Sequence, residues 1–136
     1  MQVTSKGTSV PRRWAQNLYL VWAGLIQLGI LLQGFLIGAY LFGGAAWGRD
    51  GHGIIGLVLL ALSLLLPLVG LLAQLPGSMI GMSFLLFVLV IIQVILGSIG
   101  GNIPLLAALH PANAMILFGL NLVLIFRIRQ IMRASE

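Results

Sequence analysis

The sequence LHPANAMILFGLNLVLIF, residues 109–126, places a histidine, a proline and an asparagine at the head of a long apolar run. Arg127 and Arg129 follow it, as charged residues commonly follow the apolar part of a membrane-spanning helix. The whole chain is 60% hydrophobic and 7% charged, with a mean hydropathy of +1.15. A soluble domain of 136 residues could not bury so much apolar surface, so the sequence predicts an integral membrane protein.

Charge is concentrated at the two ends of the chain. Six of the seven lysines and arginines precede the first apolar run or follow the last, and only Arg49 lies between them. Cations in these places set topology and meet anionic headgroups, so the expected partner is the lipid bilayer and not a nucleic acid. The absence of cysteine excludes disulfides, thiolate metal sites and a cysteine nucleophile.

Four apolar runs predict an all-α, up-down-up-down bundle of four membrane-spanning helices. We expect a basic arm, a transmembrane unit of four helices and a short tail, at about residues 1–16, 17–130 (helices 17–43, 52–73, 79–99 and 104–130) and 131–136. Because both ends are basic, we expect both termini in the cytoplasm and the protein in the cell's inner (plasma) membrane.

Turn residues set the expected boundaries of these helices. Residues 43–53 are rich in glycine and polar side chains, so we expect a loop there, with Asp50 capping the next helix. Pro104 suits the first position of the fourth helix, and Pro111 should either kink that helix or mark its true start.

Small and polar residues inside the apolar runs indicate where helices pack together. Gly34 and Gly38 form a small-residue motif, so we expect another helix to lie against them. Amides in lipid need partners, and we expect five of them to act mainly as hydrogen-bonding groups between helices: Gln27, Gln33, Gln93, Asn113 and Asn121. By depth Gln33, Gln93 and Asn113 should converge toward the outer face, with Asn121 two turns below Asn113 on roughly the same side.

The two histidines, His52 and His110, head the second and fourth helices, which begin on the same side of the membrane. These helices are diagonal in such a bundle, about 13 Å apart, so two inward imidazoles can ligate one metal centre. A lone metal ion would need more ligands, whereas a haem needs only two axial ligands and apolar walls. This hypothesis assigns His52 and His110 as metal ligands, Gly56 as a small residue beside the macrocycle, and Arg49 as a propionate partner. Asn113, one turn beyond His110, would support that ligand.

Two alternatives to the haem hypothesis stay open. Both histidines can instead be interfacial or bundle-packing residues that hold no cofactor. A chlorophyll-type pigment is a further candidate, because its central magnesium accepts one histidine.

The motifs Gly51-His52 with Gly56, and Leu109-His110-Pro111 with Asn113, resemble an uncharacterised family of small four-helix bacterial integral membrane proteins. That family is defined by a domain of unknown function, so the resemblance implies the fold and no activity. The paired histidines are also distantly similar to those of haem b four-helix membrane cytochromes and haem A synthase. Those proteins usually carry further histidines deeper in their helices, so the second resemblance implies at most one haem, near the outer face.

These observations predict a mono-haem b protein, acting in electron transfer or as the membrane subunit of a larger redox complex. The alternatives are a non-catalytic accessory or assembly subunit of a larger membrane complex and a carrier of a small molecule or lipid. Besides the bilayer, the expected partner is a larger membrane redox complex or further copies of the chain in a homo-oligomer. Hydrolytic catalysis is poorly supported, because the one aspartate and the one glutamate both lie outside the expected spans. We therefore assign no catalytic residues.

Overall fold

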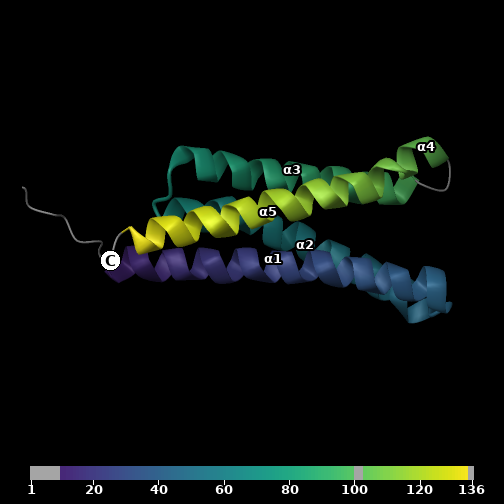
Figure 1. The fold of residues 1–136 in the computed structure, drawn as a ribbon. Coiled ribbons are helices and arrows are strands. Elements are labelled where there is room, and N and C mark those ends of the chain that lie inside the picture. The colour runs from purple at the N-terminus through teal and green to yellow at the C-terminus, as the bar shows by residue number, and fades with distance from the viewer. Residues whose placement is uncertain (1–9, 100–102, 135–136) are drawn as a thin grey trace, which may run out of the picture.

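The computed structural model describes residues 10–99 and 103–134, and every regular element within them is a helix. In chain order the helices are α1 (Val10–Gly43), α2 (Ala46–Leu72), α3 (Gly77–Ile99), α4 (Pro104–Ala107) and α5 (Leu109–Arg133) (Figure 1). Four segments are long and apolar enough to cross a membrane: α1, α2, α3, and α4 together with α5. The predicted all-α fold with four membrane-spanning segments is confirmed.

The first two helices extend beyond their expected bounds. The chain is already helical at Val10, inside the expected arm, and α2 begins at Ala46, inside the expected loop. Asp50 therefore lies in the second turn of α2 and does not cap it; the residue before α2 is Ala45, which makes no side-chain capping bond. Helical hydrogen bonds satisfy the backbone of this segment, which must otherwise find partners at the edge of a membrane.

The two prolines at the fourth span behave as the sequence predicts. Pro104 is the first residue of α4, where its missing N–H leaves no hydrogen bond unmade. Ala108 separates α4 from α5, and Pro111 lies in the first turn of α5. Pro111 thus marks the start of the long helix and does not kink its interior.

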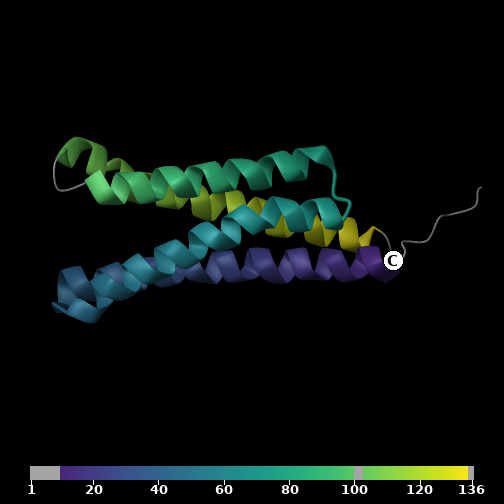
Figure 2. The same ribbon diagram turned by 180° about the vertical axis from the view of Figure 1, so that it is seen from behind.

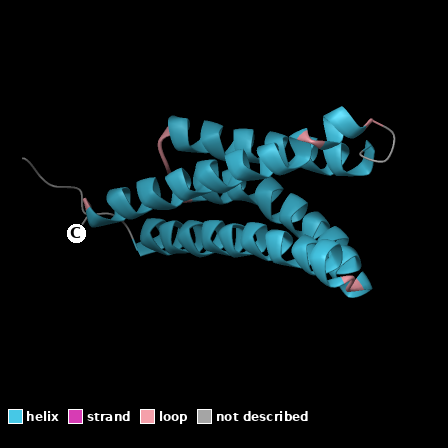
Figure 3. Ribbon diagram, turned by 45° about the vertical axis from the view of Figure 1, so that its right-hand side comes forward, coloured by secondary structure: helices cyan, strands magenta, loops and turns pink. Residues whose placement is uncertain are grey.

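The bundle consists of two antiparallel hairpins, α1 with α2 and α3 with α5 (Figures 1 and 2). Around the bundle α1 adjoins α2 and α5, and α3 adjoins the same two helices, so α2 and α5 are diagonal as expected. The hairpins pack together at the end where α1 begins and α5 ends. They diverge toward the end that carries α4 and the α1–α2 connection (Figures 1 and 3).

The buried core lies in the half of the bundle near the chain termini. The largest fully buried apolar side chains all come from that half of their helices: Tyr19, Ile26, Leu66, Met79, Leu86, Leu124 and Ile128. Many other large apolar side chains are exposed on the outside of the bundle, as expected where the surroundings are lipid.

Hydrogen bonds between the two hairpins also lie in this half. The Tyr19 hydroxyl and Ser83 Oγ are 2.7 Å apart, which joins α1 to α3. Asn121 Nδ2 donates to the Ala23 carbonyl oxygen at 2.9 Å and to Gln27 Oε1 at 2.8 Å, which joins α5 to α1.

The expected packing at Gly34 and Gly38 is wrong for this chain. A Cβ added to Gly34 would meet no atom within 4 Å, and one at Gly38 would meet only Phe42 of the same helix, at 4.0 Å. The close approach between α1 and α2 occurs instead at Gly48, where a Cβ would strike the Leu36 carbonyl oxygen. The reason is geometric, because α2 packs on a different face of α1.

Candidate functional site

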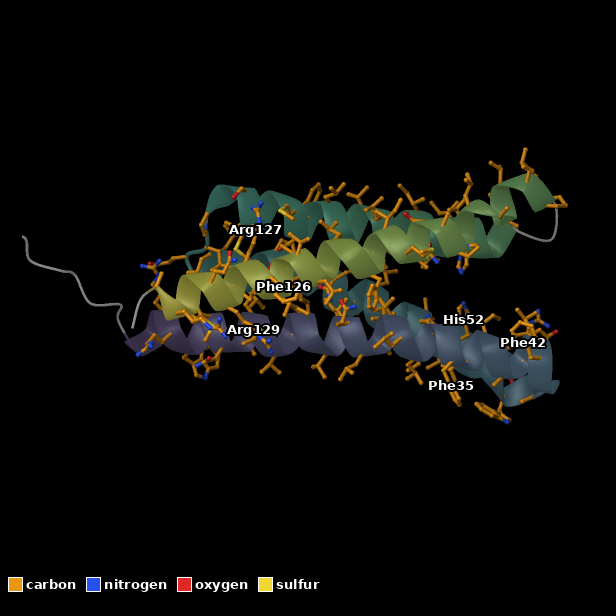
Figure 4. All side chains as sticks on the ribbon, viewed as in Figure 1. Phe35, Phe42, His52, Phe126, Arg127 and Arg129 are labelled. Carbon is orange, nitrogen blue, oxygen red and sulfur yellow. The ribbon has the colours of Figure 1, made fainter. Side chains whose placement is uncertain are left out.

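His52 and His110 meet across the diagonal of the bundle, in the half where the hairpins diverge. Their ring centroids are 5.9 Å apart and the ring planes are inclined by 52°. Figure 4 shows His52 on the side of α2 that faces the α3–α5 hairpin. The structure therefore brings the two histidines together from helices that are not neighbours.

Each imidazole is held by a backbone carbonyl of its own hairpin. His52 Nδ1 lies 3.2 Å from the Gln33 carbonyl oxygen, and His110 Nδ1 lies 3.0 Å from that of Gln93. A carbonyl oxygen only accepts hydrogen bonds, so Nδ1 carries the proton and donates it in both rings. In a neutral imidazole of this tautomer Nε2 has a free lone pair, which is the state in which histidine ligates metals.

The backbone roles of Gln33 and Gln93 were missed by sequence reasoning. Both glutamines were expected to act through their side chains, yet both orient a histidine through the main chain. A signal was present in the sequence, because each glutamine precedes its histidine by a similar interval, 19 and 17 residues. The two hairpins thus carry the same arrangement of one glutamine carbonyl and one histidine.

Asn113 supports the His110 side of the site. Its Nδ2 donates to the Leu89 carbonyl oxygen at 3.0 Å and to Gln93 Oε1 at 2.7 Å. Gln93 therefore contacts both Asn113 and His110. Gly97 gives the His110 ring its space, because a Cβ there would lie 3.1 Å from His110 Cε1.

The His52 side is bordered by Gly56, Gln33 and Arg49. A Cβ on Gly56 would lie 3.1 Å from Gln33 Nε2, so in this structure Gly56 makes room for the Gln33 amide. Gln33 Oε1 is buried and has no hydrogen-bond partner. Arg49 lies in α2 one turn before His52, and its side chain is exposed. This side thus contains an unsatisfied acceptor and a nearby cation.

Asn121 does not join this cluster, contrary to expectation. It lies eight residues beyond Asn113, which on a helix is two turns and a rotation of about 80°. The rotation directs Asn121 toward α1, where it bonds to Ala23 and Gln27. The amides therefore form two separate groups, one at the histidines and one in the core.

The protein offers few metal ligands beyond the two imidazoles. Within residues 10–99 and 103–134 there is no group of three or more histidine, cysteine, aspartate or glutamate side chains. A bare metal ion usually needs three or four protein ligands, which this site does not supply. Two imidazoles do suffice as the axial ligands of a metal already held by a macrocycle.

The fold and its composition define a small, all-helical membrane protein. Residues 33–99 match the model of a family described as a family of unknown function, DUF6220. The matched segment contains His52 and Gln93, and it ends before His110. No curated protein and no solved structure matches the chain. The match agrees with the resemblance to an uncharacterised family and assigns no activity.

Proposed function

We propose that this protein binds one haem b, with His52 and His110 as the two axial ligands. The observation that carries the proposal is the facing pair of imidazoles, each held through Nδ1 by a backbone carbonyl. Two imidazoles on opposite sides of one metal have ring centres about 6 Å apart, since each metal–nitrogen bond is ~2.0 Å long and each ring centre lies about 1 Å beyond its nitrogen. The observed separation of 5.9 Å is close to that value.

The surroundings of the two rings also suit a tetrapyrrole. The hairpins diverge at this level, and the side chains there are mostly apolar. The buried and unpaired Gln33 Oε1 and the exposed Arg49 supply polar groups at the edge of the site. In this proposal Arg49 pairs with a haem propionate, and Gly56 keeps the α2 side of the site free of a bulky side chain. Asn113 fixes the position of the helical turn that carries His110.

Two histidines favour haem over the other cofactors considered. A chlorophyll-type pigment uses a single axial histidine, which would leave the second imidazole without a role. Haem supplies reversible one-electron chemistry, and the protein would hold it, set its axial ligands and exclude water. The role that follows is electron transfer, either by the protein alone or as the membrane subunit of a redox complex.

The proposal includes an orientation in the membrane. Among the described residues, all basic side chains except Arg49 lie at the end of the bundle where α1 begins and α5 ends, and we assign that end to the cytoplasmic side of the plasma membrane. The histidines then lie near the opposite face. An electron partner would therefore meet the haem from the outer side.

The absorption spectrum of purified protein, expressed with adequate haem supply, tests this function. We expect a Soret band and a low-spin six-coordinate spectrum in both oxidation states. His52→Ala and His110→Ala should each lose the six-coordinate spectrum, and added imidazole should restore it by replacing the missing ligand. Ser98→Ala serves as the control, because Ser98 is exposed and lies near the histidine end of the bundle, and this change should leave the spectrum unchanged.

A wild-type protein without a Soret band would overturn the proposal. An accessory subunit without a cofactor, the alternative function, would be colourless, and its histidine variants would assemble like the wild type. Retention of the six-coordinate spectrum in either alanine variant would show that the assigned ligand is wrong.

A further inference from the structure

The seam between α1 and α5 has two hollows on the outer surface of the bundle. One, of about 430 Å³, is lined by Gly24, Gln27 and Arg129 among apolar side chains. The other, of about 280 Å³, is lined by Leu31, Gly34, Met115 and Phe118 with two further apolar residues. On α1 the lining residues run from Leu20 to Gly34, a distance of about 21 Å along the helix axis. The seam is therefore about as long as an extended acyl chain.

Glycine keeps this seam open. A Cβ at Gly24 or at Gly34 would meet no atom within 4 Å, so neither glycine serves close helix packing within the chain. Each one instead removes a side chain from a surface lined mostly by larger apolar residues.

One buried polar group of the larger hollow is unsatisfied. Gln27 is 9% exposed, and its Oε1 accepts a hydrogen bond from Asn121 Nδ2. That bond fixes which end of the amide faces Asn121 and leaves Gln27 Nε2 buried without an acceptor. A buried, unpaired N–H is costly, and Gln27 lines the hollow, so rotation of its side chain toward a ligand carbonyl oxygen there would be favourable.

A cation lies at the mouth of the same hollow. Arg129 is exposed and lines the hollow from α5, near the basic end of the bundle. Figure 4 shows Arg129 on the side of α5 toward α1, and Arg127 on the opposite side. Of these two arginines, only Arg129 is therefore placed to bind a ligand in the seam.

We propose that the α1–α5 seam is a binding site for an anionic phospholipid. The phosphate pairs with Arg129, an ester carbonyl accepts a hydrogen bond from Gln27 Nε2, and one acyl chain follows the seam past Gly24 to Gly34. The order of these groups along a phospholipid matches the order of cation, amide and apolar hollow along the seam. The polar end of the site, at Gln27 and Arg129, lies in the half of the bundle away from the histidines, and the site does not depend on haem binding.

A second copy of the chain fits this surface less well. In a symmetric membrane dimer the two seams would face each other in the same orientation, which brings two basic ends together. Each chain carries a net charge of +5, mostly at these ends, so such a contact would be repulsive. An anionic lipid instead neutralises Arg129.

Lipid binding can be measured on the purified full chain in an uncharged detergent. Native mass spectrometry would count bound lipid after addition of phosphatidylglycerol or phosphatidylcholine with identical acyl chains. We expect the wild type to prefer phosphatidylglycerol, and Arg129→Gln to lower that preference about fivefold, the contribution of one cation near an anionic surface. Arg127→Gln removes the same charge from the other side of α5 and should keep the preference.

A second pair of variants tests the hollow itself. Gly24→Leu fills the space that the acyl chain would occupy and should reduce binding of both lipids, while Gly81→Leu is the matched control, because Gly81 also has free space. Equal effects of Arg127→Gln and Arg129→Gln would overturn the proposal, as would undiminished binding to Gly24→Leu. Inorganic phosphate should not compete with the lipid at equal concentration. Competition would show that the site binds phosphate alone and would contradict the lipid proposal. A stable dimer lost in Gly24→Leu would assign the seam to a second copy.

Discussion

Asn121 is completely buried in the low-dielectric interior of the bundle. Both hydrogens of its amide are used, one on the Ala23 carbonyl and one on Gln27 Oε1. Hydrogen bonds between membrane helices contribute about 0.6 kcal/mol on average and up to about 1.7 kcal/mol. A residue that makes two of them should be near the upper end of that range.

We therefore expect Asn121→Leu to lower the free energy of unfolding by about 1 to 2 kcal/mol. Leucine has a similar branched shape but removes the donor that Asn121 supplies to the Gln27 and Ala23 oxygens. The measurement is reversible unfolding in mixed micelles, followed by circular dichroism. Asn17→Leu, the same change at an exposed position of α1, is the control and should be close to neutral. A neutral Asn121→Leu would show that these bonds add nothing to stability.

The sequence identifies the amides that make hydrogen bonds between helices but only some of their partners. Four of the five amides make hydrogen bonds between helices through their side chains, as predicted. Gln33 uses its backbone carbonyl, and its side-chain oxygen stays unpaired. Composition shows that an amide in lipid needs a partner, but helix rotation decides which helix supplies it.

At Gly48 the backbones of α1 and α2 come close together. A Cβ at Gly48 would strike the Leu36 carbonyl oxygen and lie 3.1 Å from the Tyr40 backbone nitrogen. Both atoms belong to backbone, so neither can move without shifting α1. Gly53, five residues further along α2, has no atom within 4 Å of its Cβ position.

Gly48→Ala should push the two helices apart and lower the free energy of unfolding by about 1 to 3 kcal/mol, the usual range for overpacking. Gly53→Ala is the control and should be neutral or slightly stabilising, because alanine is the better helix former. Thermal unfolding of both variants in one detergent makes the comparison. The same melting temperature for both would contradict the close approach at Gly48.

The start of α2 also shows why a loop was predicted where a helix forms. Residues 43–53 contain several glycines and an aspartate, which in water favour turns. Here Gly48 is buried against α1 and Gly51 lies close to Leu36, so the glycines serve packing. Local propensity could not reveal this, because the stabilising contact comes from another helix.

The distribution of charge over the whole molecule predicts its orientation. We expect single cysteines at Ser5 and Ser135, which both lie outside the described residues, to react with a membrane-impermeant thiol reagent only from the cytoplasmic side. Ala108→Cys, at the opposite end of the bundle, should react only from outside. The chain has no cysteine of its own, so each label reports one position. Reaction of Ser5→Cys or Ser135→Cys in intact cells would reverse the orientation.

Fold class, number of spans and the diagonal relation of the histidine helices could all be derived from the sequence. They depend on the length of apolar runs and on short connections, which leave few arrangements for four helices. The divergence of the hairpins could not be derived. It follows from a core concentrated in one half of the bundle, and that concentration depends on which apolar side chains face inward.

Because the hairpins are joined at one end and diverge at the other, a small change in the angle between them moves the diverging ends apart, as in a lever. The bonds from Tyr19 to Ser83 and from Asn121 to Ala23 and Gln27 act as the fulcrum, and the carbonyl of Gln33, which holds His52, lies six residues beyond Gln27, or about 9 Å along the axis. Over that arm a tilt of about 6° between the hairpins changes the distance between the imidazoles by about 1 Å. Metal–nitrogen bonds tolerate only about 0.2 Å. The spacing of the two histidines therefore amplifies any change in hairpin angle, whether a thicker bilayer or a neighbouring protein imposes it.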